Sequence, residues 1–173
     1  MLFDRKADQI LFQQVFAFVM LLLAAFIESG LGLVPSFYGS APKISFCLLF
    51  LTALYRPLAV PLYPVMLVGL IYDTVQGSPF GYTSSLYLII LGVVEWRRQF
   101  LIIADPSVIW SEFVIMLSGL MVYIFLVFFI FHGAWPPFAE ILFQIGFTAL
   151  LFPIFNWMIA FGRQVGIYLG GDQ

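Results

Sequence analysis

The sequence predicts an all-α integral membrane protein, a bundle of six transmembrane helices. Of its 173 residues, 63% are hydrophobic and only 9% are charged, whereas soluble domains are about 45–50% apolar and about 25% charged. A soluble fold of this length cannot bury so much apolar surface. The chain also divides into long apolar runs separated by short polar segments, which is the pattern of successive membrane spans.

The apolar runs predict six spans in one transmembrane domain over residues 1–173, with tails and loops too short for a soluble domain. The first run is long enough to cross a bilayer, which takes about 20 apolar residues, and too long for the apolar region of a signal peptide. The second is short, and Arg56-Pro57 separates it from the third, where Pro57, Pro61 and Pro64 crowd the start. The expected spans are residues 10–33, 42–55, 57–76, 83–96, 107–131 and 137–161.

The distribution of basic residues favours six spans with both termini cytoplasmic. Cytoplasmic loops of membrane proteins carry an excess of lysine and arginine. If residues 42–76 formed a single span, only two of the seven basic residues would lie inside. With six spans, Lys43 alone lies outside, and the other six lie inside: Arg5, Lys6, Arg56, Arg97, Arg98 and Arg163.

Two acidic residues have a structural interpretation near the inner face. Glu95 is close in sequence to Arg97 and Arg98 and is expected to form an interfacial ion pair with them. Glu112 follows the start of the fifth span by one turn, where an acid is favoured by the helix dipole.

The remaining acids of the spans, Glu28, Asp73 and Glu140, are expected toward the outer face. Glu140 begins a polar row in the sixth span, spaced by multiples of four and therefore near one face of a helix: Glu140, Gln144, Thr148 and Asn156. Such a row is expected to turn inward, where it either bonds neighbouring helices or lines a cavity that opens outward.

Residues 69–81 predict a tight outer hairpin. Gly69, Asp73 and Gly77 recur every four residues and share one helix face, where small residues let another helix approach closely. Gly77 is expected to end the third helix with a positive φ, and Pro79 prevents its continuation. A side chain of residues 83–85 is expected to cap the next helix.

Asp73 is the part of this hairpin that local rules do not explain. An acid in the last turn of a helix opposes the macrodipole. Folding the second and third spans together brings Lys43, the only outer basic residue, within about a turn of Asp73. We therefore expect a Lys43–Asp73 pair, and the alternative is exposure of Asp73 to water at the headgroups.

No motif predicts an enzyme. Cys47 and His132 are each the only residue of their type, so neither a disulfide nor a histidine–cysteine metal cluster is expected. No nucleophile with a base and no phosphate-binding loop is apparent. We expect no catalytic residue, cofactor or metal. The net charge of −2 gives no indication of nucleic-acid binding.

One stretch resembles a known family. Arg56-Pro57, Pro64, Gly69-Leu70, Asp73, Gly77, Pro79 and Gly81 follow the pattern RP…P…GLxxDxxxGxPxG. This pattern resembles the central signature of the bacterial rod shape-determining membrane proteins, the MreD family. The match covers about residues 56–91. Phe80 replaces a common leucine, and Tyr82-Thr83-Ser84 is more polar than is usual in the family.

The resemblance implies a non-enzymatic membrane scaffold subunit of the cell-elongation machinery in the bacterial inner membrane. Its implied partners are a periplasm-facing scaffold of the MreC type, an MreB-type filament protein and a glycosyltransferase–transpeptidase pair that inserts peptidoglycan, all surrounded by membrane lipid. The family is also similar to the six-helix substrate-binding subunits of energy-coupling-factor transporters.

The leading hypothesis is therefore a scaffold, and the alternatives are a substrate-binding subunit of a vitamin-type transporter or a small proton- or ion-coupled permease. A substrate-binding subunit is expected to have an outward pocket near Glu28, Asp73 and Glu140. A transporter favours polar groups and broken helices near mid-membrane, whereas these acids lie near the interfaces. The candidate structural and partner-binding residues are Asp73, Gly69, Gly77, Pro79, Gly81, Lys43, Glu140 and Gln144.

Overall fold

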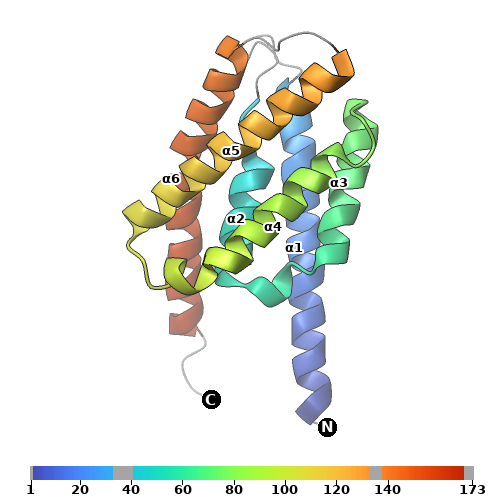
Figure 1. Ribbon diagram of the computed structural model, residues 1–173. Coiled ribbons are helices and arrows are strands. Elements are labelled where there is room, and N and C mark those ends of the chain that lie inside the picture. Colours follow the sequence, from blue (N-terminus) through green and yellow to red (C-terminus); the bar gives the residue numbers. More distant parts are fainter. Residues whose placement is uncertain (1, 33–40, 133–137, 170–173) are drawn as a thin grey trace.

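The computed structural model describes residues 2–32, 41–132 and 138–169, and all regular structure in these ranges is helical. Consecutive helices run in opposite directions, so that the start of α1 and the end of α6 lie at the same end of the bundle (Figure 1). The elements are α1 (Leu2–Gly32), α2 (Ile44–Tyr55), the 3-10 helix η2 (Pro57–Ala59), α3 (Leu62–Gln76), α4 (Tyr82–Leu101), α5 (Pro106–His132) and α6 (Phe138–Leu169). We call the end with the α3–α4 turn the hairpin end, and the end with the α2–α3 turn the Arg56 end.

Three stretches of the described helices are long and apolar enough to cross a membrane. They are Ile10–Gly32 of α1, Pro106–Ile130 of α5 and Ile141–Ile159 of α6. The apolar helices α2 and α3 are shorter, with 12 and 15 residues. At 1.5 Å per residue, α2 is only about 18 Å long, less than the roughly 30 Å hydrocarbon core of a bilayer. The long apolar helices indicate a membrane protein, in agreement with the composition.

The prolines after Arg56 delay the start of α3. The third span was expected from residue 57, but Pro57 begins η2, and α3 begins at Leu62. Pro61 precedes α3 with an extended backbone (ψ 151°). Proline lacks the N–H that a helix interior uses, and it fits most easily just before a helix or in its first turn. The chain therefore makes a separate short turn here.

The buried core of the bundle is centred on α2. Eight of its twelve residues are buried, and it contacts α1, α4 and α6. Phe50 of α2 packs edge-on against Phe113 of α5 and Phe152 of α6, with ring centroids 5.3 Å and 5.7 Å away. Phe113 and Phe152 stack on each other at 4.3 Å. These rings join α2, the shortest of the α-helices, to α5 and α6.

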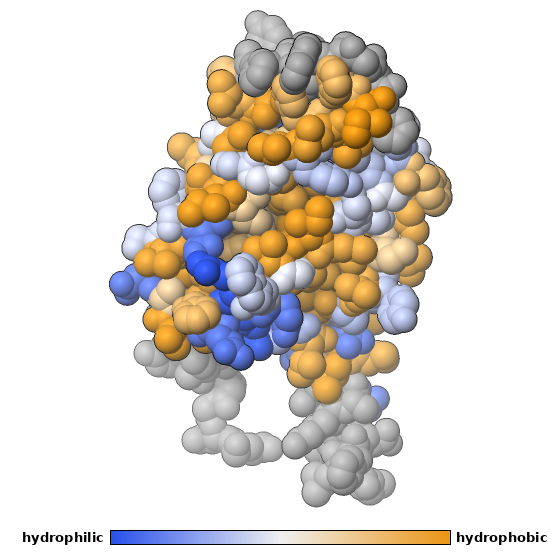
Figure 2. Space-filling model, viewed as in Figure 1, coloured by the Kyte–Doolittle hydropathy of each residue, from blue (hydrophilic) through white to orange (hydrophobic). Residues whose placement is uncertain are grey.

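The outer helices show the opposite pattern, because few residues in the apolar stretches of α1 and α6 are buried. Figure 2 shows apolar residues over much of the visible face, and hydrophilic residues gathered over the α4–α5 junction. Glu95 and Gln99 are exposed there, and Arg97 and Arg98 are half-buried. Apolar faces of this extent need lipid or protein against them, since water does not solvate them favourably.

Candidate functional site at the hairpin end

The turn between α3 and α4 depends on two glycines in the left-handed region. Gly77 ends α3 with φ 67°, and Gly81 precedes α4 with φ 87°. The Ser78 N–H donates to the carbonyl of Asp73 at 3.1 Å, and the Tyr82 N–H donates to that of Pro79 at 3.0 Å. The predictions that Gly77 has a positive φ and that the helix stops there are confirmed. Glycine adopts this conformation without a Cβ clash.

The two helices of the hairpin approach each other closely at Gly69. A Cβ on Gly69 would lie 2.6 Å from the Cα of Ser84 in α4, which is shorter than any real carbon contact. The Ser84 hydroxyl donates to the carbonyl of Met66 at 2.9 Å. The prediction that the small residues of this face admit another helix is confirmed for Gly69, and the neighbour is α4.

Asp73 caps the helix that follows the turn. Its side chain is fully buried, and Oδ1 accepts the N–H of Thr83 in the first turn of α4 at 2.9 Å. The residue at the N-cap position of α4 is Gly81, which has no side chain to cap the helix. The carboxylate therefore opposes the dipole of α3 but is stabilised by the positive end of α4. Oδ2 has no hydrogen-bond partner among the described residues.

Two sequence predictions about this region are wrong. No side chain of residues 83–85 caps α4, because the Ser84 and Ser85 hydroxyls donate to backbone carbonyls instead. The predicted Lys43–Asp73 pair is also absent, since Lys43 Nζ lies 2.5 Å from Glu28 Oε1. The reason is that Glu28 is buried in α1 and requires a cation, whereas a backbone N–H already binds Asp73.

The Lys43–Glu28 pair is the centre of a larger hydrogen-bonded group. The Tyr72 hydroxyl donates to Glu28 Oε1 at 3.0 Å, and the Ser45 hydroxyl donates to Oε2 at 2.7 Å. Gln76 Nε2 donates to the Tyr72 oxygen at 2.9 Å, and Lys43 Nζ lies 5.5 Å from the centre of the Tyr72 ring. We call these five residues the Glu28 cluster. It joins α1, α2 and α3 and satisfies both carboxylate oxygens.

The polar row of α6 bonds the start of α2. Gln144 Nε2 donates to the carbonyl of Ala41 at 2.9 Å, and the backbone N–H of Lys43 donates to the Thr148 hydroxyl at 3.0 Å. Near the other end of α2, the Tyr55 hydroxyl donates to Asn156 at 3.0 Å. These contacts support the interpretation that the row bonds neighbouring helices. Glu140 lies in α6, but its side chain is outside the described residues.

A cavity of ≈ 220 Å³ also opens at the hairpin end. Its lining is largely polar and includes part of the Glu28 cluster: Glu28, Lys43, Tyr72 and Gln76, together with Tyr82 and Gln144. Asp73 does not line this cavity, although its partner Thr83 does. The arrangement offers a cation, a carboxylate and several hydrogen-bonding groups in one place.

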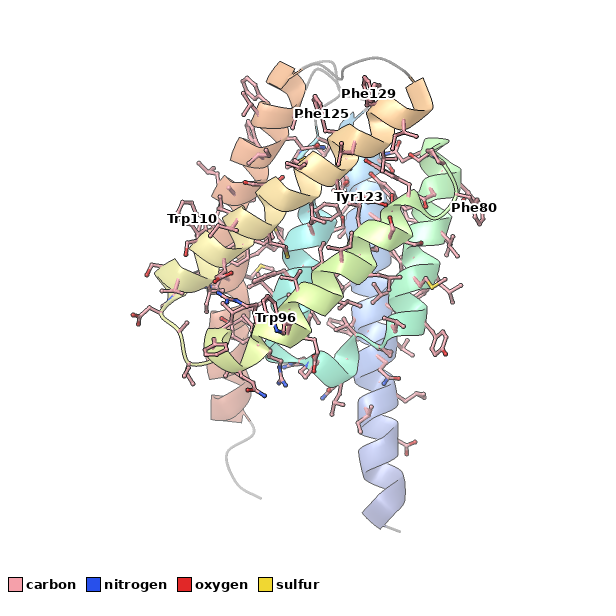
Figure 3. The ribbon with its side chains drawn as sticks, in the orientation of Figure 1. Phe80, Trp96, Trp110, Tyr123, Phe125 and Phe129 are labelled. Atoms are coloured by element: carbon pink, nitrogen blue, oxygen red, sulfur yellow. The ribbon has the colours of Figure 1, made fainter. Side chains whose placement is uncertain are left out.

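At the tip of the hairpin, Phe80 projects away from the bundle (Figure 3) and is 76% exposed. Phe80 lies in the turn between Gly77 and Gly81, the two glycines with a left-handed backbone conformation. A large exposed aromatic residue on a turn that is fixed from both sides is a typical anchor for a partner, because aromatic side chains dominate interface hot spots.

A second ion pair lies at the α4–α5 junction, toward the Arg56 end. Arg97 binds Glu112 of α5, so the expected ion pair of Glu95 with Arg97 and Arg98 is wrong. The guanidinium of Arg98 donates to the carbonyl of Leu54 at 3.3 Å. Arginine thus connects α4 to both α5 and α2. A connection between α4 and α5 is the reason that the local Glu95 pairing does not form.

Sequence reasoning overlooked most of the Glu28 cluster. Tyr72 and Gln76 are four residues apart and share a helix face, and this spacing was the available signal. Ser45 gave no signal. Glu28 was expected near the outer face, but Lys43, which binds it in the structure, was expected to pair with Asp73.

Within the part of the chain whose side chains are described, no group of three or more His, Cys, Asp and Glu residues is arranged to hold a metal ion. Comparisons of the chain with protein-family models, with curated proteins and with solved structures found no match.

Proposed function

We propose that this protein is a non-enzymatic scaffold subunit of the bacterial cell-elongation machinery, of the MreD type, in the inner membrane. The single observation that carries the proposal is the construction of the α3–α4 hairpin. The signature residues Gly69, Asp73, Gly77 and Gly81 all act on its shape, by close packing, by capping and by left-handed turns.

The contacts of Asp73 support a structural role for the signature residues of the hairpin. Its carboxylate is fully buried and binds a backbone N–H, so it is not presented to a substrate. What the hairpin does present is Phe80. In the proposal this tip docks a periplasm-facing scaffold of the MreC type. Through it the protein joins the MreB-type filament and the glycosyltransferase–transpeptidase pair, with no reaction or cofactor of its own.

The proposed topology has six spans, a periplasmic hairpin end and cytoplasmic termini. It is supported by the alternating direction of the helices (Figure 1). It is supported also by the described cations, because Arg56, Arg97 and Arg98 lie in the half of the molecule that holds the termini, and Lys43 lies at the hairpin end. A reporter that is active only in the periplasm, fused after Gln173, should be silent. A strong signal would contradict this topology.

The scaffold proposal is tested by Phe80→Ala. Tyr63→Ala is a matched control, because Tyr63 is equally exposed, at 79%, near the other end of α3. We expect recovery of the MreC-type partner from membranes to fall strongly for Phe80→Ala, since a hot-spot aromatic contributes about 2 kcal/mol or more. Cells that carry it should lose rod shape, and Tyr63→Ala should change neither. Equal partner recovery and normal shape for Phe80→Ala, at equal expression, would contradict docking at the tip.

The second candidate function, a substrate-binding subunit of a vitamin-type transporter, is favoured by the polar cavity beside the Glu28 cluster. A ligand that binds only the folded protein raises its unfolding temperature. Vitamins that raise this temperature for the wild type but not for Gln144→Leu would favour this function. A screen without such a ligand, together with partner loss in Phe80→Ala, would favour the scaffold.

A further inference from the structure

A groove of ≈ 380 Å³ lies near the Arg56 end, on the opposite half of the bundle from the polar cavity. Figure 1 shows α2 between α1 and α6, and α2 forms the floor of the groove. Its apolar lining comes mainly from α1 and α2: Phe12, Phe16, Ala17, Met20, Leu48 and Leu51. The volume is within the range of small-molecule sites, about 300–1,000 Å³.

The polar residues of the groove include Gln13 and Arg56. Arg56 is exposed, and no carboxylate of the described residues lies within ion-pair distance of it. The other described cations are occupied, since Lys43 binds Glu28, Arg97 binds Glu112, and Arg98 binds a backbone carbonyl. An apolar groove with one unpaired cation at its end is complementary to an anion that carries a hydrocarbon chain.

The length of the groove favours a lipid over a partner helix. From Leu48 in α2 to Arg56 directly after the helix, the rise is about 12 Å. A spanning partner helix would need a contact surface closer to the roughly 30 Å of the hydrocarbon core. A length of about 12 Å is close to the roughly 15 Å depth of one leaflet, half of the hydrocarbon core, which one acyl chain fills.

We propose that this groove binds one anionic phospholipid. Arg56 and the Gln13 amide bind the phosphate headgroup, and one acyl chain lies along α2 between Phe16 and Leu48. The site is independent of the hairpin and of the proposed scaffold function.

The experiment is native mass spectrometry of the detergent-purified protein titrated with phosphatidylglycerol or phosphatidylcholine. Wild type should retain phosphatidylglycerol preferentially. Arg56→Gln should lower its apparent affinity about fivefold, the factor expected for one cation beside an anionic surface, and Arg56→Lys should keep most of the preference. Arg97→Gln, which removes a cation outside the groove, is the control and should change nothing.

A second variant tests whether the lipid lies in the groove, independently of the charge of Arg56. Ala17→Phe fills the groove, so it should reduce retention of both lipids, and Ala17→Leu is a milder filling if the first variant does not fold. Equal phosphatidylglycerol retention by wild type and Arg56→Gln would overturn the proposal. Retention that depends on Arg56 but not on Ala17 would also overturn it, because the lipid would then lie outside the groove. Unchanged retention with loss of a protein partner in Ala17→Phe would show that a helix covers the groove instead.

Discussion

The two ion pairs of the described chain have the same chemistry in different surroundings. In the Glu28 cluster, the Lys43 and Glu28 side chains are 20% and 1% exposed, whereas Arg97 and Glu112 are 38% and 22% exposed. The first pair has hydrogen-bond partners on three helices, and the second joins α4 to α5 beside a hydrophilic patch. A buried charge is costly unless it is paired and bonded, so the first pair should couple the positions of its helices more strongly than the second.

The largest expected effect comes from Lys43→Met, which leaves Glu28 buried without its cation. Removing one partner of a buried pair costs about 3–5 kcal/mol. Replacing both, as Glu28→Leu with Lys43→Met, should recover most of this loss. Unfolding in mixed micelles measures both variants. If Lys43→Met alone lowers the free energy of unfolding by less than about 1 kcal/mol, the value for exposed pairs, the two ion pairs do not differ as described.

Gly69→Ala tests the packing of the hairpin end independently of its charges. The added methyl group would meet the Ser84 backbone, which cannot move as a flexible side chain can, so we expect a loss of about 1–3 kcal/mol. Gly92→Ala in α4 is the matched control, because its added methyl group would enter open space; it should be neutral or stabilising by up to about 1 kcal/mol. Equal effects of both would contradict the close approach.

Asp73→Ala removes the cap of α4 and should cost about 0.5–2 kcal/mol in the same unfolding measurement. Asp73→Asn keeps an oxygen acceptor and loses only the interaction of the charge with the helix dipole, about 0.3–1 kcal/mol. If the protein is the proposed scaffold, this variant should insert normally yet bind the proposed MreC-type partner more weakly, which co-purification measures. If Asn and Ala are equally destabilising, the hydrogen bond to Thr83 is not what Asp73 contributes.

The smallest effect is expected for Arg97→Gln, about 0–1 kcal/mol. Salt screens exposed charges, so the difference from wild type should shrink further as ionic strength rises. The Lys43→Met difference should stay nearly constant in the same titration. An Arg97→Gln cost that is large and independent of salt would place the second pair in the same class as the first.

Local sequence rules predicted the parts of this structure that depend on local geometry. The helical character, the turn at Gly77 and the close approach at Gly69 follow from apolar run lengths, backbone freedom and small-residue spacing. The partner of Asp73 does not, because it depends on how α4 is placed against α3 and on Glu28 occupying Lys43 first. The late start of α3 was indicated by its prolines, but its position follows from the conformation that Pro57 and Pro61 adopt together.

The shortness of α2 has a consequence for how the chain is made. This helix leaves the ribosome flanked by Lys43 and Arg56, and a charged residue within a bilayer is costly to insert. At about 18 Å, it gains little by moving into lipid alone. Of its final neighbours, α1 is already synthesised, whereas α4 and α6 follow later. We therefore expect α2 to wait at the translocation machinery until those helices arrive, so that the centre of the bundle is completed last.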